Sequence, residues 1–348
     1  MRAGHFKQSY PELVALTDSG AVKAWTVTLL VACMALPWVA SSYVLALATT
    51  ILITGIGVVG LNLLTGVCGL ISLGHAGFLA IGAYTAAVLA VDYAVPVVPG
   101  IICGGLLAAA LSLLVGIPSL RLKGLYLAIT TLAFTIIVTH SILNLDWLTR
   151  GSAGLSLPAA DLLGVSLAGK VSFYYFSLAV CVLFVAAATN LMRSRIGRAF
   201  VAIRDHDIAA EMMGINLVAY KLMAFALSAF FTGAAGALAA YQVRYINVDS
   251  FAVLVSIEAL AMIIVGGLGS IAGAILGTIF MSLLPEFTRW LFDALGSGLT
   301  ETFSTRALEV RGLIYGVVIM TVLRVQPDGL IGLWRDAKRL WSNWPFRY

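Results

Sequence analysis

The stretch YVLALATTILITGIGVVGLNLL, residues 43–64, decides the fold class of this 348-residue chain. It contains no Asp, Glu, Lys or Arg, and it is as long as the roughly 20 apolar residues that a helix needs to cross a bilayer. It lies inside a longer uncharged region, Trp25–Val91, which has room for three such helices. A water-soluble fold could not bury so much apolar surface, so this region indicates a membrane protein.

The rest of the chain has the same character. Apolar residues make up 61% of it, charged residues only 11%, and the mean hydropathy is +1.01. An ordinary soluble domain has about 25% charged residues. This composition excludes a cytosolic enzyme, a disordered chain and a collagen-like fibre. The strict alternation of apolar and polar residues that marks a membrane β-barrel is missing. We therefore predict an all-α fold, a polytopic transmembrane helical bundle.

Ten apolar segments are long enough to be predicted as spans, although some are short. They are Trp25–Ala40, Tyr43–Leu64, Ser72–Val91, Val97–Ile117, Leu125–Leu143, Ser172–Met192, Leu222–Val243, Phe251–Val265, Ile271–Phe292 and Gly312–Leu323.

The connections between these spans alternate in charge. One set holds 15 of the 21 Lys and Arg residues, and such cations are retained on the cytoplasmic side, so both termini are predicted there. The polar start of the chain argues against a cleaved signal peptide. The predicted parts are a cytoplasmic N-terminal segment 1–24, one transmembrane domain 25–324 with an outer loop 144–171 and an inner connection 193–221, and a basic cytoplasmic tail 325–348.

The motifs of an enzyme are missing. The nearest match to a phosphate-binding P-loop, Gly164–Val171, has Val171 where Ser or Thr would hold magnesium, and it falls on the predicted outer side. We find no metal-ligand spacing and no catalytic pair, and the net charge of +5 does not indicate nucleic-acid binding. No cofactor and no metal are therefore predicted. The four cysteines are expected to be small buried apolar residues: Cys33, Cys68, Cys103 and Cys181.

The segment Gly60–Tyr84 is unusually rich in glycine, which weakens a continuous helix. Two interpretations remain open and are compatible. Small residues allow close helix packing, and a broken helix lines a solute path in many transporters. His75 is a gate or pH switch under one interpretation and a structural hydrogen-bonding residue under the other. The polar residues predicted near the solute pathway are Asn62, Thr65, Ser72, His75 and Glu258, the last being a carboxylate within an apolar span.

A second glycine-rich segment follows the eighth predicted span. Gly269, Gly273 and Gly277 are four residues apart, so they are expected to line one face of a helix. Such a face packs closely against another helix or another subunit.

The inner connection is the most informative polar segment. Between Gly197 and Gly214 the residues favour a helix in which Phe200, Ile203, Ile208 and Met212 form an apolar stripe. Such a helix either lies on lipid or docks in a groove of another protein. Acidic residues interrupt the bases on its polar face, and this mixture favours a protein partner.

Several motifs together resemble the permeases of branched-chain amino acid ABC importers, in particular the M-type permease. They cover most of the chain, from about Leu61 to Leu330. The motifs are Leu61-Asn62-Leu-Leu-Thr65-Gly66, Ser72-Leu-Gly74-His75-Ala-Gly77-Phe78, Thr149-Arg-Gly151-Ser-Ala-Gly154-Leu155, Gly197-Arg198-Ala199, Ala202-Ile203-Arg204-Asp205, Ala209-Ala210-Glu211-Met-Met213-Gly214, Gly312-Leu-Ile-Tyr315-Gly316 and Gln326-Pro327-Asp328-Gly329-Leu330.

The resemblance implies a subunit of the bacterial inner membrane, surrounded by lipid, that moves a solute inward by alternating access. Its implied partners are a second related permease, two cytoplasmic ATP-binding subunits and an extracytoplasmic solute-binding protein. Relatives carry branched-chain amino acids, urea, short amides or aromatic acids, and Arg150 departs from the small residue expected there. The resemblance makes the inner helix the one that couples to the ATPases, through Gly197, Arg198, Phe200, Ile203, Arg204, Asp205, Ile208, Glu211 and Gly214.

Two other functions compete with this one. A secondary transporter would couple ions through Glu258 or His75 without any ATPase. A membrane scaffold or lipid-handling enzyme is disfavoured, because no catalytic cluster is present.

Overall fold

The computed structural model describes residues 20–119, 124–162, 165–295, 307–326 and 328–343. The helices are α2 (Gly20–Val39), α3 (Ser42–Leu61), the π-helical turn η1 (Asn62–Val67), α4 (His75–Asp92), α5 (Val97–Ser119), α6 (Leu125–Asn144), α7 (Asp146–Thr149), η2 (Gly151–Ala153), α8 (Lys170–Arg193), α9 (Arg195–Asp205), α10 (Asp207–Met212), α11 (Leu217–Val243), η3 (Val248–Phe251), α12 (Val253–Gly266), α13 (Ile271–Leu295), α15 (Ala307–Val325) and α16 (Leu330–Asn343).

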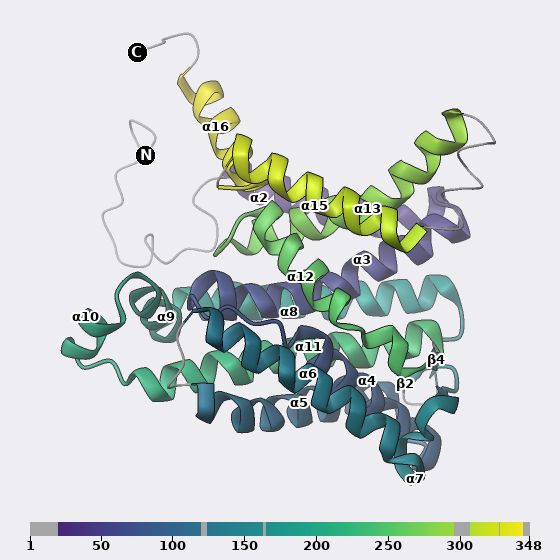
Figure 1. Cartoon of the computed structure of the whole chain (residues 1–348). Helices are drawn as coiled ribbons and strands as arrows, with labels where there is room; N and C mark the ends of the chain where they lie inside the picture. The colour runs from purple at the N-terminus through teal and green to yellow at the C-terminus, as the bar shows by residue number, and fades with distance from the viewer. Residues whose placement is uncertain (1–19, 120–123, 163–164, 296–306, 327, 344–348) are drawn as a thin grey trace.

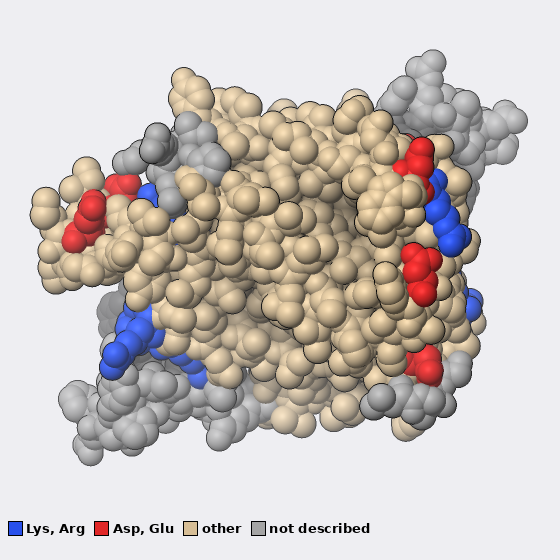
Figure 2. Space-filling model, turned by 90° about the horizontal axis from the view of Figure 1, so that it is seen from below, with Lys and Arg blue, Asp and Glu red and all other residues tan. Residues whose placement is uncertain are grey.

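The predicted helical bundle is confirmed. Eight helices in the described part of the chain are long and apolar enough to cross a membrane, and two shorter apolar helices, Ala24–Val39 and Gly312–Val322, bring the total close to the ten predicted spans. The spans run side by side, with α9 and α10 at one end of the bundle and α7 and β4 at the other (Figure 1). On the face shown in Figure 2, charged side chains gather at the two ends and leave a broad uncharged belt between them.

The longest helix, α11, occupies the centre and packs against α3, α4 and α5. Glycines bring these helices together. A β-carbon added to Gly82 of α4 would fall on the backbone of Gly233 of α11, and one added to Gly104 of α5 would lie 2.8 Å from the Gly82 carbonyl oxygen. The backbone amide of Ala219 donates to the Asn216 side chain at 3.1 Å, which caps the start of α11.

The outer connection 144–171 is more ordered than a plain loop. It contains α7, η2 and the strands β1 (Leu155–Ser156), β2 (Asp161–Leu162) and β3 (Val165–Ser166). β1 pairs with β4 (Tyr245–Ile246) in antiparallel register, and β2 pairs with β3. Glycines with positive φ at Gly151 and Gly154 allow the tight turns before β1.

The prediction of buried cysteines is correct for Cys68, partly correct for Cys33 and Cys181, and wrong for Cys103. Cys68 is buried and Cys33 and Cys181 are half-buried, whereas Cys103 is exposed on α5. An apolar span can face lipid on one side, so an apolar run does not imply burial within the protein. All four described cysteines are free.

Candidate functional site

The inner connection forms two helices, not one. α9 ends at Asp205, His206 adopts an extended conformation, and α10 begins at Asp207. The prediction of a single helix from Gly197 to Gly214 is therefore wrong. The polar run Asp205-His206-Asp207 could have indicated the break, because an acidic residue is favoured in the first turn of a new helix.

The first half of the predicted apolar stripe is buried in the chain itself. Phe200 is fully buried and meets the Tyr220 ring edge-on, and Ile203 is 5% exposed. A β-carbon at Gly197 would collide with the carbonyl oxygens at the end of α8. These three residues hold α9 against α8 and α11, so they are not free to contact a partner, as the sequence had suggested.

The second half of the stripe is uncovered. The exposed fractions are 66% for Ile208, 84% for Met212 and 85% for Met213. Asp205 and Glu211 are exposed beside them, and the Asp207 carboxylate lies 3.9 Å from the Lys221 ammonium. Gly214, with φ of +86°, turns the chain from α10 toward α11.

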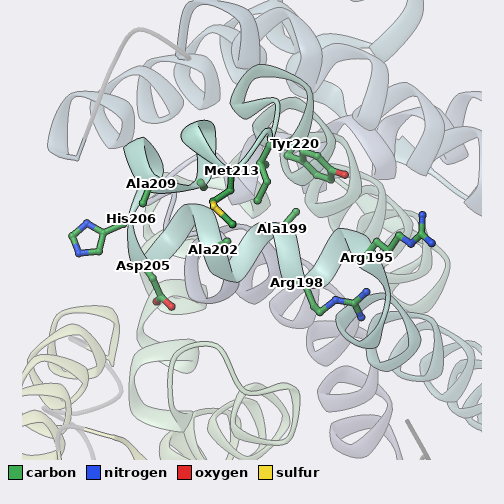
Figure 3. Close-up of a pocket in the computed structure, with 11 residues that line it drawn as sticks. Arg195, Arg198, Ala199, Ala202, Asp205, His206, Ala209, Met213 and Tyr220 are labelled. Carbon is green, nitrogen blue, oxygen red and sulfur yellow. The ribbon is translucent and has the colours of Figure 1, made fainter. Parts of the chain in front are cut away.

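An open, largely apolar cavity of about 570 Å³ lies between these two helices and the start of α11. Ala199 and Ala202 form its α9 side, and Met213 points back toward α9 (Figure 3). Arg195 and Arg198 mark one end of α9, while Asp205 and His206 mark the other (Figure 3). The site therefore offers apolar surface between a positive and a negative end, which is the chemistry of a protein-docking surface.

One predicted coupling residue, Arg204, points elsewhere. Its guanidinium donates a hydrogen bond to the carbonyl oxygen of Gly66 in η1, and its aliphatic part lies against Gly69. By contrast, the Arg198 guanidinium donates to the Arg193 carbonyl oxygen at 3.1 Å, beside its own helix.

The glycine-rich segment Gly60–Tyr84 is indeed a broken helix. α3 widens into η1, residues 68–74 are not helical, and α4 begins at His75. Close packing accompanies the break, since a β-carbon at Gly60 would collide with Phe231 of α11. Both interpretations of the glycines therefore describe the same segment. Whether a solute passes beside it stays a prediction.

Four of the predicted pathway residues lie in or next to this break. The Asn62 side-chain oxygen accepts from the Gly269 amide at 2.9 Å, and the Thr65 hydroxyl donates to the Leu70 carbonyl oxygen at 3.1 Å. The Ser72 hydroxyl accepts from the Gly74 amide at 3.2 Å. His75 is buried, and its Nδ1 lies 3.4 Å from the Thr232 hydroxyl. Their polar groups thus serve the broken backbone and its packing.

Three hydroxyl residues that the sequence analysis missed complete this cluster. Thr131 of α6 accepts from the Leu73 amide at 2.9 Å, Ser256 of α12 accepts from the Ala76 amide at 2.9 Å, and Thr232 contacts His75. Their only sequence signal is a hydroxyl within an apolar span, which is common. Glu258 lies on α12, two residues after Ser256, and is half-buried.

The three glycines expected on one helix face do not share it. Gly269 lies in the turn between α12 and α13, with φ of +81°, because α13 begins only at Ile271. Gly273 and Gly277 lie on α13 and face α12 of the same chain. A β-carbon at Gly273 would lie 2.8 Å from the Gly266 carbonyl oxygen. In the described residues, no three His, Cys, Asp or Glu side chains gather closely enough to hold a metal ion.

Comparison with known proteins now gives the family. The model of the branched-chain amino acid transport system / permease component family matches residues 43–323. The chain belongs to this family. The match includes the broken helix and both α9 and α10.

Individual relatives agree with this assignment. The permease is 35% identical to the high-affinity branched-chain amino acid transport system permease protein LivM of Escherichia coli K12, over 91% of this chain and 77% of LivM. It is 27% identical to a probable branched-chain amino acid transport permease protein LivH of Methanocaldococcus jannaschii, over 50% of this chain and 53% of that LivH. It is 29% identical to the autoinducer 2 import system permease protein LsrC of Salmonella paratyphi B, over 40% of each chain. No solved structure matches the permease significantly.

Proposed function

We propose that this chain is one permease subunit of an ABC importer that moves a small polar solute inward by alternating access. Membership of the branched-chain amino acid transport permease family over residues 43–323 supports branched-chain or other amino acids as the solute. The energy comes from partner ATPases, and this chain itself hydrolyses nothing. The other partners are a second related permease and an extracytoplasmic solute-binding protein.

One observation carries the proposal, the uncovered apolar face of α10. Ile208 and Met212 are exposed on a short helix that follows α9 after one residue, and Met213, directly after that helix, is exposed too; α9 is anchored in the bundle by Phe200 and Ile203. A subunit that grips α10 therefore pulls on a helix that is rigidly connected to the spans. Coupling an ATPase to a permease requires such a connection. A partner can shift a conformational equilibrium only if it contacts the two conformations with different affinity.

The orientation follows from the charges. The α9–α10 end carries Arg193, Arg195, Arg198, Arg204 and Lys221, so the positive-inside rule assigns it to the cytoplasm together with both termini. The membrane is then the bacterial inner membrane, where cytoplasmic ATPases can reach α10.

The decisive experiment is reconstitution. We would place the chain in liposomes with its candidate second permease and ATPases, supply the solute-binding protein with labelled leucine, and measure uptake with ATP on the ATPase side. The control replaces the P-loop lysine of the ATPase, which should abolish uptake. Uptake by the permeases without any ATPase would contradict the proposal and favour ion coupling through Glu258 or His75. ATP-driven uptake of urea or an aromatic acid, but not leucine, would correct the solute only.

A further inference from the structure

Arg204 is the side chain through which α9 reaches the broken end of α3. The two residues that it joins, Arg204 and Gly66, are 138 positions apart in the sequence. We propose that Arg204 is a positioning residue that carries the movement of α9 to η1 and so couples the ATPase stroke to the solute pathway. This inference rests on the proposed function, and it names the part of the chain that transmits the stroke.

The choice of partner is unusual for a basic residue in the last turn of a helix. Such a residue commonly satisfies the last carbonyl groups of its own helix. Arg204 instead donates to a carbonyl group of a different helix, and a charged donor makes this kind of hydrogen bond about twice as strong as a neutral one. The hydrogen bond therefore connects α9 to η1. A bond from Arg204 to carbonyl groups of its own helix would not connect the two elements.

The receiving segment is built to keep the guanidinium close. A β-carbon at Gly66 would collide with the Asn62 side-chain oxygen and the Gly269 amide, and one at Gly69 would lie 3.2 Å from the Arg204 side chain. Gly69 also has φ of +77°, a conformation that residues with a side chain rarely adopt. Gly66 thus lets η1 approach the α12–α13 turn, and Gly69 lets the segment after η1 approach α9.

The contact belongs to a junction of several elements. The Gly269 amide donates to Asn62, which ties the α12–α13 turn to η1. A β-carbon at Gly267 of that turn would collide with Ile331 at the start of α16, so the C-terminal helix rests on the same place. A displacement of Arg204 is therefore applied where α3, α9 and the α12–α13 turn meet.

This junction also has the marks of an element with a second arrangement. A π turn is rare and often occurs at functional sites. The buried amide nitrogen of Asn62 has no hydrogen-bond partner in this arrangement, although buried polar groups are nearly always satisfied. On its far side the broken segment leads to Ser72 and His75, which are buried among α6, α11 and α12. A shift of η1 would therefore reach the interior of the bundle.

The first test compares three variants in the reconstituted complex. Arg204→Ala should leave the complex assembled and hydrolysing ATP, while solute transported per ATP falls about tenfold. Arg204→Lys keeps the charge but not the planar guanidinium group. Its solute transported per ATP should lie between the values of the parent and of Arg204→Ala. The matched control is Arg244→Ala, because the Arg244 guanidinium also donates to a distant carbonyl oxygen, that of Ala168 at 2.9 Å, but next to β4 at the opposite end of the bundle. The Arg244→Ala complex should transport as much solute per ATP as the parent complex.

An unchanged ratio in Arg204→Ala would overturn the inference, whereas failure of the parent complex to transport with ATP would overturn the proposed function itself. The two failures are therefore distinguishable.

A second test uses a native thiol and does not depend on transport. Cys68 is buried and adjoins Gly69, and burial raises the pKa of its thiol to about 12, so it should react slowly in this arrangement. With Cys33, Cys103 and Cys181 replaced by Ala, we would measure N-ethylmaleimide labelling of Cys68 with and without trapped nucleotide on the ATPases. The labelling rate should change about fivefold in the parent, change less in Arg204→Lys, and remain unchanged in Arg204→Ala. A parent that shows no change, or a variant that shows the full change, would contradict the inference.

Discussion

α9 and α10 are adjacent in sequence, yet their apolar residues face opposite environments. The apolar residues of α9, Phe200 and Ile203, are buried among the spans of the same chain. Those of α10 and the residue after it, Ile208, Met212 and Met213, are exposed. The difference shows that one connection contains both a buried anchor and an exposed apolar surface, and this surface is the one that we propose docks the ATPase.

The extended residue His206 makes this division possible. A continuous helix would keep all four apolar residues of the predicted stripe on one face, so they would be buried together or exposed together. The break lets α10 present its apolar side away from the bundle while α9 stays in place. The predictions below test the division, from the largest expected effect to the smallest.

The largest effect is expected from a charge in the anchor. Ile203→Asp puts an unpaired carboxylate into a buried apolar site, and it should cost more than about 4 kcal/mol of folding free energy. The yield of monodisperse protein in detergent should collapse. Ile208→Asp is the matched control and should purify like the parent, because Ile208 is exposed. Equal yields of the two variants would contradict the division between α9 and α10.

The docking surface should respond in the opposite way. The double variant Ile208→Asp and Met212→Asp should fold normally but bind the ATPase about 100-fold more weakly, since buried apolar anchors dominate interface energies. Affinity can be measured by titrating labelled ATPase onto the permease in nanodiscs. Replacing Leu114 and Ile117 of α5, which are also exposed, with Ala provides a control that should leave the affinity unchanged. Undiminished ATPase binding by the double variant would show that α10 is not the docking surface.

A smaller effect is expected at the start of α9. The Ser194 hydroxyl accepts from the Ile196 amide at 3.1 Å and caps α9, whereas His206, the N-cap residue of α10, makes no side-chain capping hydrogen bond. Ser194→Ala should lower stability by about 1 kcal/mol, seen as a decrease of a few degrees in Tm. His206→Ala should leave the Tm unchanged. A larger loss in the His206 variant than in the Ser194 variant would reverse the assignment.

The smallest effect is expected at the ion pair between Asp207 of α10 and Lys221 of α11. Asp207→Asn removes the charge facing Lys221 across 3.9 Å and should change stability by less than about 1 kcal/mol, as partly exposed pairs do. The difference from the parent should shrink further in 1 M salt, where the Debye length is about 3 Å. Denaturant titrations at low and high salt measure it. A stability difference that persists at high salt would mean that Asp207 stabilises the protein by more than its electrostatic attraction to Lys221.

The sequence was sufficient for the bundle, because long apolar segments can only be spans, and dense glycines marked where a helix is weakened. It also located the α9–α10 connection and the broken helix as the two regions of interest. Apolar periodicity, however, predicts that a stripe of residues will be buried, but it does not indicate whether the same chain or a partner buries it. Phe200 and Ile203 are covered by α8 and α11, and only the three-dimensional arrangement separates them from Ile208.

The remaining misses have the same origin. The spacing of four residues grouped Gly269, which donates its amide to Asn62, with Gly273, which packs against α12, although the glycine-rich turn at Gly266–Gly269 correctly indicated a break between the two spans. The contact between Arg204 and Gly66 and the pairing of β1 with β4 join segments far apart in the sequence, so periodicity carries no sign of them. Thr131, Thr232 and Ser256 were missed because a hydroxyl within a span satisfies its own helix in most cases.

The glycine contacts at the centre of the bundle limit how the protein can deform. Gly82, Gly104 and Gly233 meet backbone to backbone where α4, α5 and α11 come together, and sliding any of these helices by one turn would press side chains into atoms that leave them no space. These three helices should therefore travel as one rigid block throughout the cycle. Opening and closing must then come from elements around that block, and the break in regular helix at η1, where α3 ends, offers a hinge beside it.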